Sequence, residues 1–138
     1  MDSGLNNVTT KQLSIIKTSS GSIMHALKSN ERDYKGFGEI YFSQVNSGEI
    51  RGWKKHKIMH SNLIVPYGKM KIVTYDGIEF KEHTLSKKNY IRLSIPAKII
   101  YGFQCISETF ALLVNIASIP HDINEVEEIK LDELNYKW

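Results

Sequence analysis

The chain has 138 residues, a length that suits one domain with a single buried core. Hydrophobic residues make up 41% and charged residues 24%, proportions that are typical of a globular protein and exclude a disordered chain. The net charge is only +3 and the lysines are dispersed, whereas a protein that binds nucleic-acid duplexes usually presents a concentrated basic face. The charge therefore favours small phosphate-bearing molecules over nucleic acid as partners.

The sequence also carries signals about location. No apolar run approaches the roughly 20 residues that a membrane span needs. Residues 1–17 contain neither a continuous apolar stretch nor a small-residue cleavage site, so we expect no secretory signal. The single cysteine, Cys105, cannot form an internal disulfide. We expect a cytoplasmic protein without membrane contact.

Nothing in the chain marks a boundary between two domains. It has only three prolines, no Ser/Gly linker, no charge block and no repeat at solenoid periods. We expect a single domain over residues 1–138, with a polar, turn-rich N-terminal segment over 1–36 and a β-strand core over 37–138.

Short segments rich in β-branched and aromatic residues follow Gly38 at regular spacing. The expected strands are Glu39–Gln44, Ile50–Trp53, Asn62–Val65, Lys69–Tyr75, Ile78–Glu82, Tyr90–Ile95, Gly102–Ile106 and Phe110–Ile116. Gly68 and Gly77 lie between strands, where glycine accepts the positive φ of a hairpin turn.

Alternation of apolar and polar residues in several of these segments is typical of half-buried antiparallel strands. About eight short strands with tight turns predict an all-β protein, a β-sandwich or barrel and most simply a jelly roll. The interior of a small barrel holds side chains and one small ligand, so inward-facing polar residues are the first candidates for function.

The densest group of reactive side chains spans residues 48–62. Lys54 and His56 are two apart, so on a strand they point to the same face. The region resembles the first metal-binding motif of the cupin family, with Lys54 at the first His position and Ser61 or His60 at the Glu position. The segment that begins at Pro96 resembles the second cupin motif, with Tyr101 at its His position. The two resemblances imply that the fold is a cupin-type jelly-roll barrel.

Lysine, serine and tyrosine are poor ligands for zinc, iron or manganese. We therefore predict that the site holds no metal and no cofactor, and a metal-dependent cupin enzyme is the least favoured alternative. The remaining groups suit proton transfer beside a carbonyl. His56 can remove a proton, Lys54 can stabilise the enolate oxygen, and Tyr101 can return a proton.

Each of these residues also has an ordinary structural interpretation. His56 lies between two lysines and can be a solvated strand residue, Lys54 can be a surface lysine, and Tyr101 can be a packing residue. The four remaining histidines have no partner that the sequence reveals and are left unassigned: His25, His60, His83 and His121.

Several segments, in this order, resemble the dTDP-4-dehydrorhamnose 3,5-epimerase family, in its short single-barrel branch. They are Gly38–Asn46, Arg51–Lys57, Ile95–Phe103, Ile119–Asp122 and Leu131–Tyr136. The resemblance implies that Gln44 and Asn46 contact the nucleotide and that Arg51, whose guanidinium suits phosphate oxygens, holds the diphosphate.

Three catalytic positions of that family differ in this chain. Lys54 replaces the catalytic His, the late-strand catalytic Tyr corresponds to about Leu113, and the stretch that supplies an Asp to the base lies beyond residue 138. The sugar 3,4-ketoisomerases are also similar, because their Arg-Gly-x-His-x-His-Lys motif resembles residues 51–57 with His56 and Lys57 retained.

These resemblances imply an epimerase that removes a proton next to the C4 ketone of a nucleotide-diphosphate 4-keto-6-deoxy sugar, used in polysaccharide biosynthesis. The alternatives are a sugar 3,4-ketoisomerase and a catalytically silent barrel that binds a nucleotide sugar. The expected substrate-binding residues are Arg51, Gln44, Asn46, Lys57 and Asn62. We also expect a homodimer, because small barrels often cover their edge strands with a second subunit.

Overall fold

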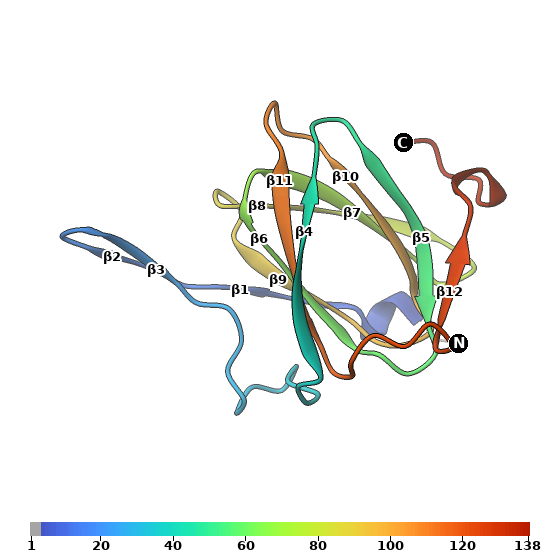
Figure 1. Ribbon diagram of the computed structural model, residues 1–138, viewed down its shortest axis with the longest axis horizontal. Coiled ribbons are helices and arrows are strands. Elements are labelled where there is room, and N and C mark those ends of the chain that lie inside the picture. Colours follow the sequence, from blue (N-terminus) through green and yellow to red (C-terminus); the bar gives the residue numbers. More distant parts are fainter. Residues whose placement is uncertain (1–3) are drawn as a thin grey trace.

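The computed structural model describes residues 4–138 and is all-β, as the strand pattern predicts (Figure 1). The strands are β1 Thr9–Gln12, β2 Ile15–Thr18, β3 Gly21–Met24, β4 Glu39–Val45, β5 Ile50–His56, β6 Ser61–Tyr67, β7 Lys69–Tyr75, β8 Phe80–Ser86, β9 Ile91–Ile95, β10 Ile100–Cys105, β11 Ala111–Ala117 and β12 Val126–Ile129. Two short 3-10 turns, η1 (Gly4–Asn7) and η2 (Leu131–Glu133), complete the described elements. No described helix has the length and apolar character that a membrane crossing needs.

Two five-stranded antiparallel sheets face each other and form the jelly roll. Their strand orders are β1-β9-β6-β11-β4 and β12-β5-β10-β7-β8. The inner faces of both sheets meet in the main core, which contains Val45, Leu63, Val65, Met70, Ile72, Leu85, Leu93, Ile95, Tyr101 and Phe103. Strands β4 and β5 leave one side of the barrel open, because they are joined by a turn and are not paired with each other.

All eight expected strands are present, with most ends displaced by one to three residues. The largest shift is in β8, which runs over Phe80–Ser86 and not over Ile78–Glu82. The Asp76 carboxylate accepts hydrogen bonds from the backbone N–H groups of Ile78 and Glu79, both at 2.9 Å. Ile78 therefore belongs to the turn, where it is 82% exposed.

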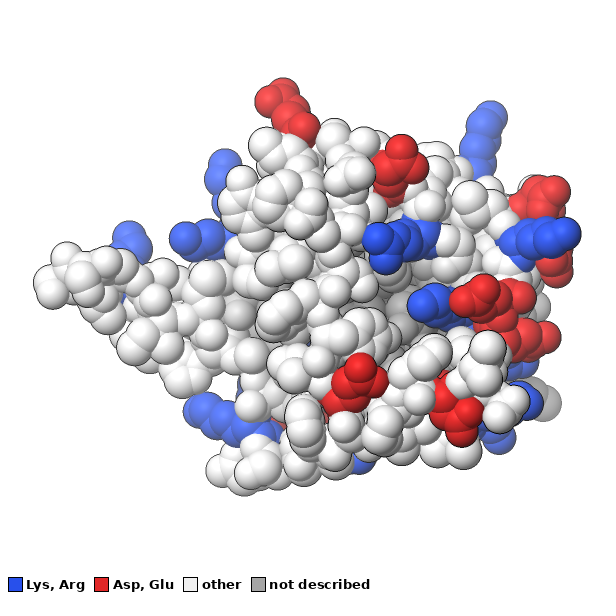
Figure 2. All heavy atoms as spheres, viewed as in Figure 1, with Lys and Arg blue, Asp and Glu red and all other residues white. Residues whose placement is uncertain are grey.

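Four strands lie where the sequence analysis expected none. β1 and β12 are edge strands with mostly polar exposed residues, and an edge strand needs few apolar side chains. β2 and β3 form a hairpin that projects from the barrel (Figure 1), and Figure 2 shows few charged atoms on it. Residues 1–3 of the expected N-terminal segment lie outside the described residues.

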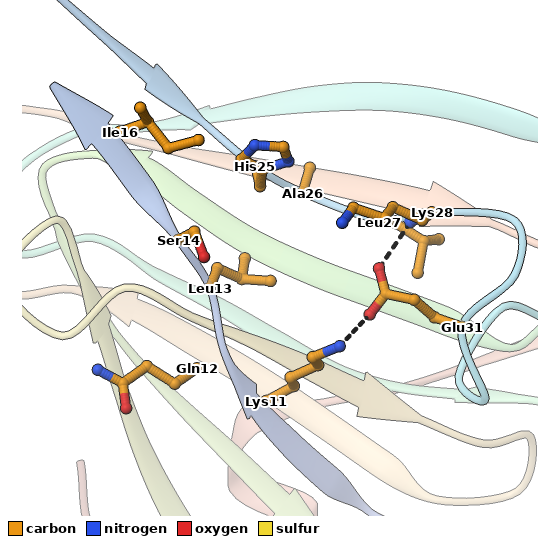
Figure 3. A pocket seen from close by; sticks show the side chains of 10 residues that line it. All are labelled: Lys11, Gln12, Leu13, Ser14, Ile16, His25, Ala26, Leu27, Lys28 and Glu31. Carbon is orange, nitrogen blue, oxygen red and sulfur yellow. Dashed lines mark hydrogen bonds and ion pairs between the residues drawn. The ribbon is translucent and has the colours of Figure 1, made fainter. Parts of the chain in front are cut away.

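A buried arginine fastens the segment after the hairpin to the barrel. The side chain of Arg92 on β9 is fully buried, and its Nη2 atom lies 3.0 Å from Glu31 and 3.5 Å from Asp33. Glu31 also accepts hydrogen bonds from the Lys11 ammonium at 2.6 Å and the Lys28 backbone N–H at 2.7 Å (Figure 3). These donors, with Lys11 first, lower the pKa of Glu31 to about 2.

Candidate active site

A cavity of about 40 Å³ opens between β4 and β5, on the open side of the barrel. Its lining residues are Tyr41, Ser43, Arg51, Lys54, Leu63, Tyr101, Phe103, Leu113 and Asn115. Two wider surface hollows also include Lys54, one along β5 and β12 beside Glu128 and one beside Glu39 and His121. Figure 2 shows a hollow on this face with basic and acidic side chains at its rim. Lys54 thus stands where the interior meets the surface.

A β-bulge brings two cations to this cavity. Along β5, Gly52 and Trp53 together oppose the single residue Gly102 of β10. Strict alternation would place Arg51 and Lys54 on opposite faces, but the extra residue turns both side chains toward the cavity. The Arg51 guanidinium also crosses the open side and donates to the backbone carbonyl of Gln44 at 2.9 Å.

His56 lies on the same face of β5 as Lys54, as a spacing of two residues on a strand requires. The imidazole is buried, and it stacks on the Tyr101 ring with centroids 6.1 Å apart and planes inclined by 28°. The three residues expected to be catalytic therefore lie together: Lys54 and Tyr101 line the cavity, and His56 stacks on Tyr101.

Glu125, just before β12, holds His56 in place. One carboxylate oxygen is hydrogen bonded to His56 Nδ1, and the other accepts the backbone N–H groups of Ile58 and Met59 at 3.1 Å. Burial raises the pKa of Glu125, but the hydrogen bonds from His56, Met59 and Ile58 outweigh burial and bring it below its ordinary value. The ionised carboxylate accepts Nδ1–H, which leaves Nε2 as the proton acceptor.

A chain of hydrogen-bonding side chains crosses the cavity from β10 to β4. Tyr101 is hydrogen bonded to Ser61, and the Asn115 amide donates to Ser61 at 3.4 Å and to the Tyr41 hydroxyl at 2.9 Å. Burial is the main reason why the pKa of both Tyr101 and Tyr41 is raised. Both phenols therefore stay protonated at neutral pH and can act as proton donors.

Two buried polar atoms around this cavity have no hydrogen-bond partner among the described residues. They are His56 Nε2 and Asn115 Oδ1. Buried polar atoms in folded proteins almost always have a partner, so an unsatisfied acceptor in a cavity marks a place for a bound polar group. Here a base and an amide oxygen offer such places beside Lys54.

The other expected binding residues lie apart from the cavity. Gln44 is on the outer face of β4, opposite to the cavity residues Tyr41 and Ser43. Asn46 begins the turn after β4, and its carbonyl accepts the Glu49 backbone N–H at 3.0 Å.

Lys57 and Asn62 are held by loops at the other end of the barrel. The exposed Lys57 ammonium donates to the Asn124 carbonyl at 3.3 Å. The amide of Asn62 donates to the Asp33 carbonyl at 3.0 Å and accepts the Ser94 hydroxyl. Asn62 therefore fastens the segment around Asp33, on the face of β6 away from the cavity.

The unassigned histidines have different surroundings. His83 is buried beside the Thr74 hydroxyl at 3.1 Å, and burial lowers its pKa to about 4. His60 has a buried, unpartnered Nε2 atom, and burial lowers its pKa too. His121 lines a surface hollow of the candidate site, and His25 lines a hollow near the hairpin (Figure 3).

Sequence reasoning missed Tyr41, Asn115 and Glu125. Alternation along Glu39–Gln44 would have placed Tyr41 on one face with Ser43, which was a usable signal. No sequence signal pointed to Glu125, because it is 69 residues from His56 and lies in a polar loop. No three His, Cys, Asp or Glu side chains within residues 4–138 gather as metal ligands. The absence of a metal stays a prediction that rests on the chemistry of the side chains.

The family model described as FdtA: WxcM-like, C-terminal matches residues 6–131. The chain belongs to this family. No protein of curated function matches it. A dTDP sugar isomerase from Desulfovibrio desulfuricans G20 is 30% identical with a TM-score of 0.93, and the match covers 100% of this chain and 94% of that protein.

Two more distant solved structures share the fold. QdtA, a sugar 3,4-ketoisomerase from Thermoanaerobacterium thermosaccharolyticum in complex with TDP, is 23% identical with a TM-score of 0.77, over 89% of this chain and 88% of that one. The 3,5-epimerase RmlC from Legionella pneumophila Philadelphia 1 is 17% identical with a TM-score of 0.78, over 90% and 73%. The predicted resemblance to cupin-type sugar epimerases and ketoisomerases is confirmed.

Proposed function

We propose that this FdtA-family protein is an epimerase or isomerase of a dTDP-linked 4-keto-6-deoxy sugar, and that it removes a proton next to the C4 ketone. The observation that carries the proposal is the environment of His56. Its Nδ1 is held by a carboxylate, its Nε2 is buried and unpartnered, and its ring stacks on Tyr101, which lines the cavity together with Lys54 and Tyr41. The 30% identical dTDP sugar isomerase supports the same substrate class.

In the proposed reaction, His56 Nε2 takes the proton from the carbon beside the ketone. Glu125 stabilises the imidazolium that forms, since its carboxylate already accepts the Nδ1–H hydrogen bond. The Lys54 ammonium at the rim of the cavity stabilises the negative charge on the enolate oxygen.

The proton returns to the sugar from a second group. Tyr101 stacks on His56, and Tyr41 faces the cavity from β4, so both phenols are within the same enclosure. A proton from Tyr101, the donor that the sequence suggested, would arrive from the sheet that carries His56. A proton from Tyr41 would arrive from the opposing sheet.

Arg51 is the proposed diphosphate-binding residue. It lines both the cavity and the hollow along β5 and β12, so a sugar in the cavity would place its diphosphate beside the guanidinium. We propose that the nucleotide contacts three further residues only where it extends beyond the cavity. Gln44 and Asn46 lie farther along and after β4, and Lys57 lies just after the opposite end of β5. The amide of Asn62 is already engaged, and we assign it no substrate contact.

One observation supports the alternative, a 3,4-ketoisomerase reaction. Leu113 lines the cavity at the place where the sequence resemblance puts the epimerases' late-strand tyrosine. The tyrosine of the epimerases is therefore absent from this position on β11, and Tyr41 on β4 is the phenol that faces the cavity from the same sheet.

The test is incubation of the protein with a dTDP-4-keto-6-deoxy sugar in heavy water, followed by NMR. Deuterium at C4 with a new 3-keto product supports the ketoisomerase, and deuterium at C3 and C5 with the 4-ketone retained supports the epimerase. His56→Ala should abolish exchange while dTDP still binds. Binding without exchange in the unaltered protein would favour the silent barrel and contradict the proposal.

We also propose that the protein is a cytoplasmic homodimer that serves polysaccharide biosynthesis. The free, buried thiol of Cys105 is consistent with a reducing compartment. Exposed apolar side chains support a dimer: Ile16 and Ile23 on the projecting hairpin, and Ile40 and Phe42 on the outer face of the edge strand β4.

A further inference from the structure

The outer side of the β5 bulge is covered by the last residues of the chain. Trp53 points away from the cavity and is only 1% exposed, because Phe80 of β8 and two aromatic residues of the C-terminal segment pack on it. The ring centroids of Trp138 and Tyr136 lie 5.2 and 5.9 Å from that of Trp53. Figure 1 shows this segment turning back from η2 toward β5.

The Trp138 ring also lies close to Gly102, the β10 residue opposite the bulge. A Cβ added to Gly102 would lie 3.1 Å from the Trp53 ring, 3.3 Å from the Trp138 ring and 3.1 Å from the Arg51 carbonyl oxygen. The bulge is therefore confined on its outer side, and removal of the Trp138 indole would leave space into which Trp53 can move.

Other contacts fix the tail to strands that do not take part in the bulge. The Tyr136 hydroxyl donates to the Glu82 carboxylate of β8 at 2.5 Å. The Lys71 ammonium of β7 lies 5.3 Å from the Tyr136 ring centroid and 5.2 Å from that of Trp138, and donates to the Trp138 carbonyl at 3.4 Å. The segment that contains Tyr136 and Trp138 is therefore held in a fixed position against β5.

We propose that Trp138 is a positioning residue for Arg51 and so controls binding of the nucleotide diphosphate. Arg51 is separated from Trp53 and Lys55 by an even number of residues, so regular alternation along β5 would place all three side chains on the outer face. Only the bulge turns Arg51 inward, whereas His56 and Lys54 face the cavity without it. The inference rests on the proposed function, in which Arg51 contacts the diphosphate.

The test measures dTDP binding by calorimetry, and turnover with a dTDP-keto sugar, in a double-mutant cycle. Trp138→Ala should raise Kd and KM about tenfold and leave kcat within about twofold, since misplacement of a binding group costs affinity while the base is unchanged. In the Arg51→Ala background the same substitution should change Kd by less than about twofold, because the two residues act through one interaction.

Two further variants separate positioning from general loss of structure. Tyr75→Ala removes a residue of the same outer cluster that stacks on Phe80, with centroids 4.1 Å apart, and has no ring contact with Trp53. It should lower the melting temperature without changing Kd. Gly102→Ala disturbs the bulge directly and should reproduce the Trp138→Ala result, so it replaces that variant where Trp138→Ala does not fold.

Unchanged dTDP affinity in both Trp138→Ala and Gly102→Ala would overturn the inference, and so would a loss that adds fully to that of Arg51→Ala. An unaltered protein that does not bind dTDP at all would instead contradict the proposed function, and the inference would fall with it.

Discussion

At the scale of single residues, the site depends on which polar atoms have hydrogen-bond partners within the protein and which do not. The Glu125 carboxylate has its two oxygens filled by His56 and by two backbone N–H groups, so it can hold the imidazole in one orientation. The opposite ring nitrogen is left free in a buried place. A histidine with one nitrogen fixed and the other open is the arrangement expected of a general base.

Glu125→Gln should reduce kcat on the order of 10²- to 10⁴-fold, because a neutral amide neither selects the Nδ1–H tautomer nor stabilises the imidazolium. The affinity for dTDP should stay within about twofold, since Glu125 lies away from Arg51. Steady-state kinetics and calorimetry measure the two effects. Glu128→Gln, at the exposed rim, is the matched control; an equal loss of kcat there would contradict the role of Glu125.

Lys98 carries backbone strain next to the base. Its φ of 74° is in the left-handed region, and its N–H donates to the His56 carbonyl at 2.7 Å. Lys98→Gly should increase the free energy of unfolding by about 0.5–1 kcal/mol, since glycine relieves the strain and loses part of that gain in unfolded-chain entropy. Urea denaturation measures the change.

The neighbouring substitution Ala97→Gly is the control for Lys98→Gly. Ala97 has a negative φ, so glycine there only adds unfolded-chain entropy and should destabilise the protein by about 0.5–1 kcal/mol. If both variants were destabilised to the same extent, the backbone at Lys98 would not be strained.

At the scale of elements, β4 and β5 decide where the cavity opens and which side chains reach it. β4 and β5 are joined by a short turn but are not paired, and this leaves the gap where the cavity lies. The bulge in β5 then places Arg51 in that gap. On the opposite side, the ion pairs of Arg92 fasten the segment that follows the projecting hairpin.

The fastening of this segment should depend on pH. The pKa of Glu31 is lowered to about 2 in the folded protein, so Glu31 adds stability at neutral pH that is lost as pH falls from about 4.5 toward 2. Glu31→Gln should therefore cost about 2 kcal/mol at pH 7, after a discount for solvent contact, and progressively less below pH 4.5.

Urea denaturation of the unaltered protein and of Glu31→Gln at pH 7, 4.5 and 3 measures this difference. Glu127→Gln, on the exposed face of β12, should show no comparable loss at any of these pH values. A difference for Glu31→Gln that stays constant down to pH 3 would show that the ion pairs with Lys11 and Arg92 are not its cause.

At the scale of the whole molecule, exposed apolar side chains lie outside the barrel core. Phe42 is 64% exposed on the outer face of β4, and the projecting hairpin carries Ile16 and Ile23. Apolar surface on an edge strand is a liability that a second subunit can cover. The proposed homodimer would bury these side chains without closing the inner cavity.

Phe42→Asp should convert the proposed dimer to a monomer, because a buried, unpaired carboxylate at the interface is unfavourable. Light scattering should show the mass fall from twice to once the chain mass of 15.8 kDa. Ile78→Asp, in the turn before β8, changes an even more exposed apolar residue away from β4 and should leave the mass unchanged. An unaltered protein that is monomeric would contradict the homodimer itself.

Periodicity along the chain was enough to predict the all-β class, the eight central strands and the shared face of Lys54 and His56. These features are local, since side chains on a strand alternate with a period of two. Family resemblance added the proposed substrate class and the role of Arg51.

Contacts between distant segments decided the rest. The bulge that turns Arg51 inward arises from the pairing of β5 with β10 around Gly102. Glu125 reaches His56 from a loop that is distant in the sequence, and the Asn62 amide is hydrogen bonded to the Asp33 carbonyl. Register and long-range hydrogen bonds depend on which strands become neighbours, and no local pattern of residues contains that information.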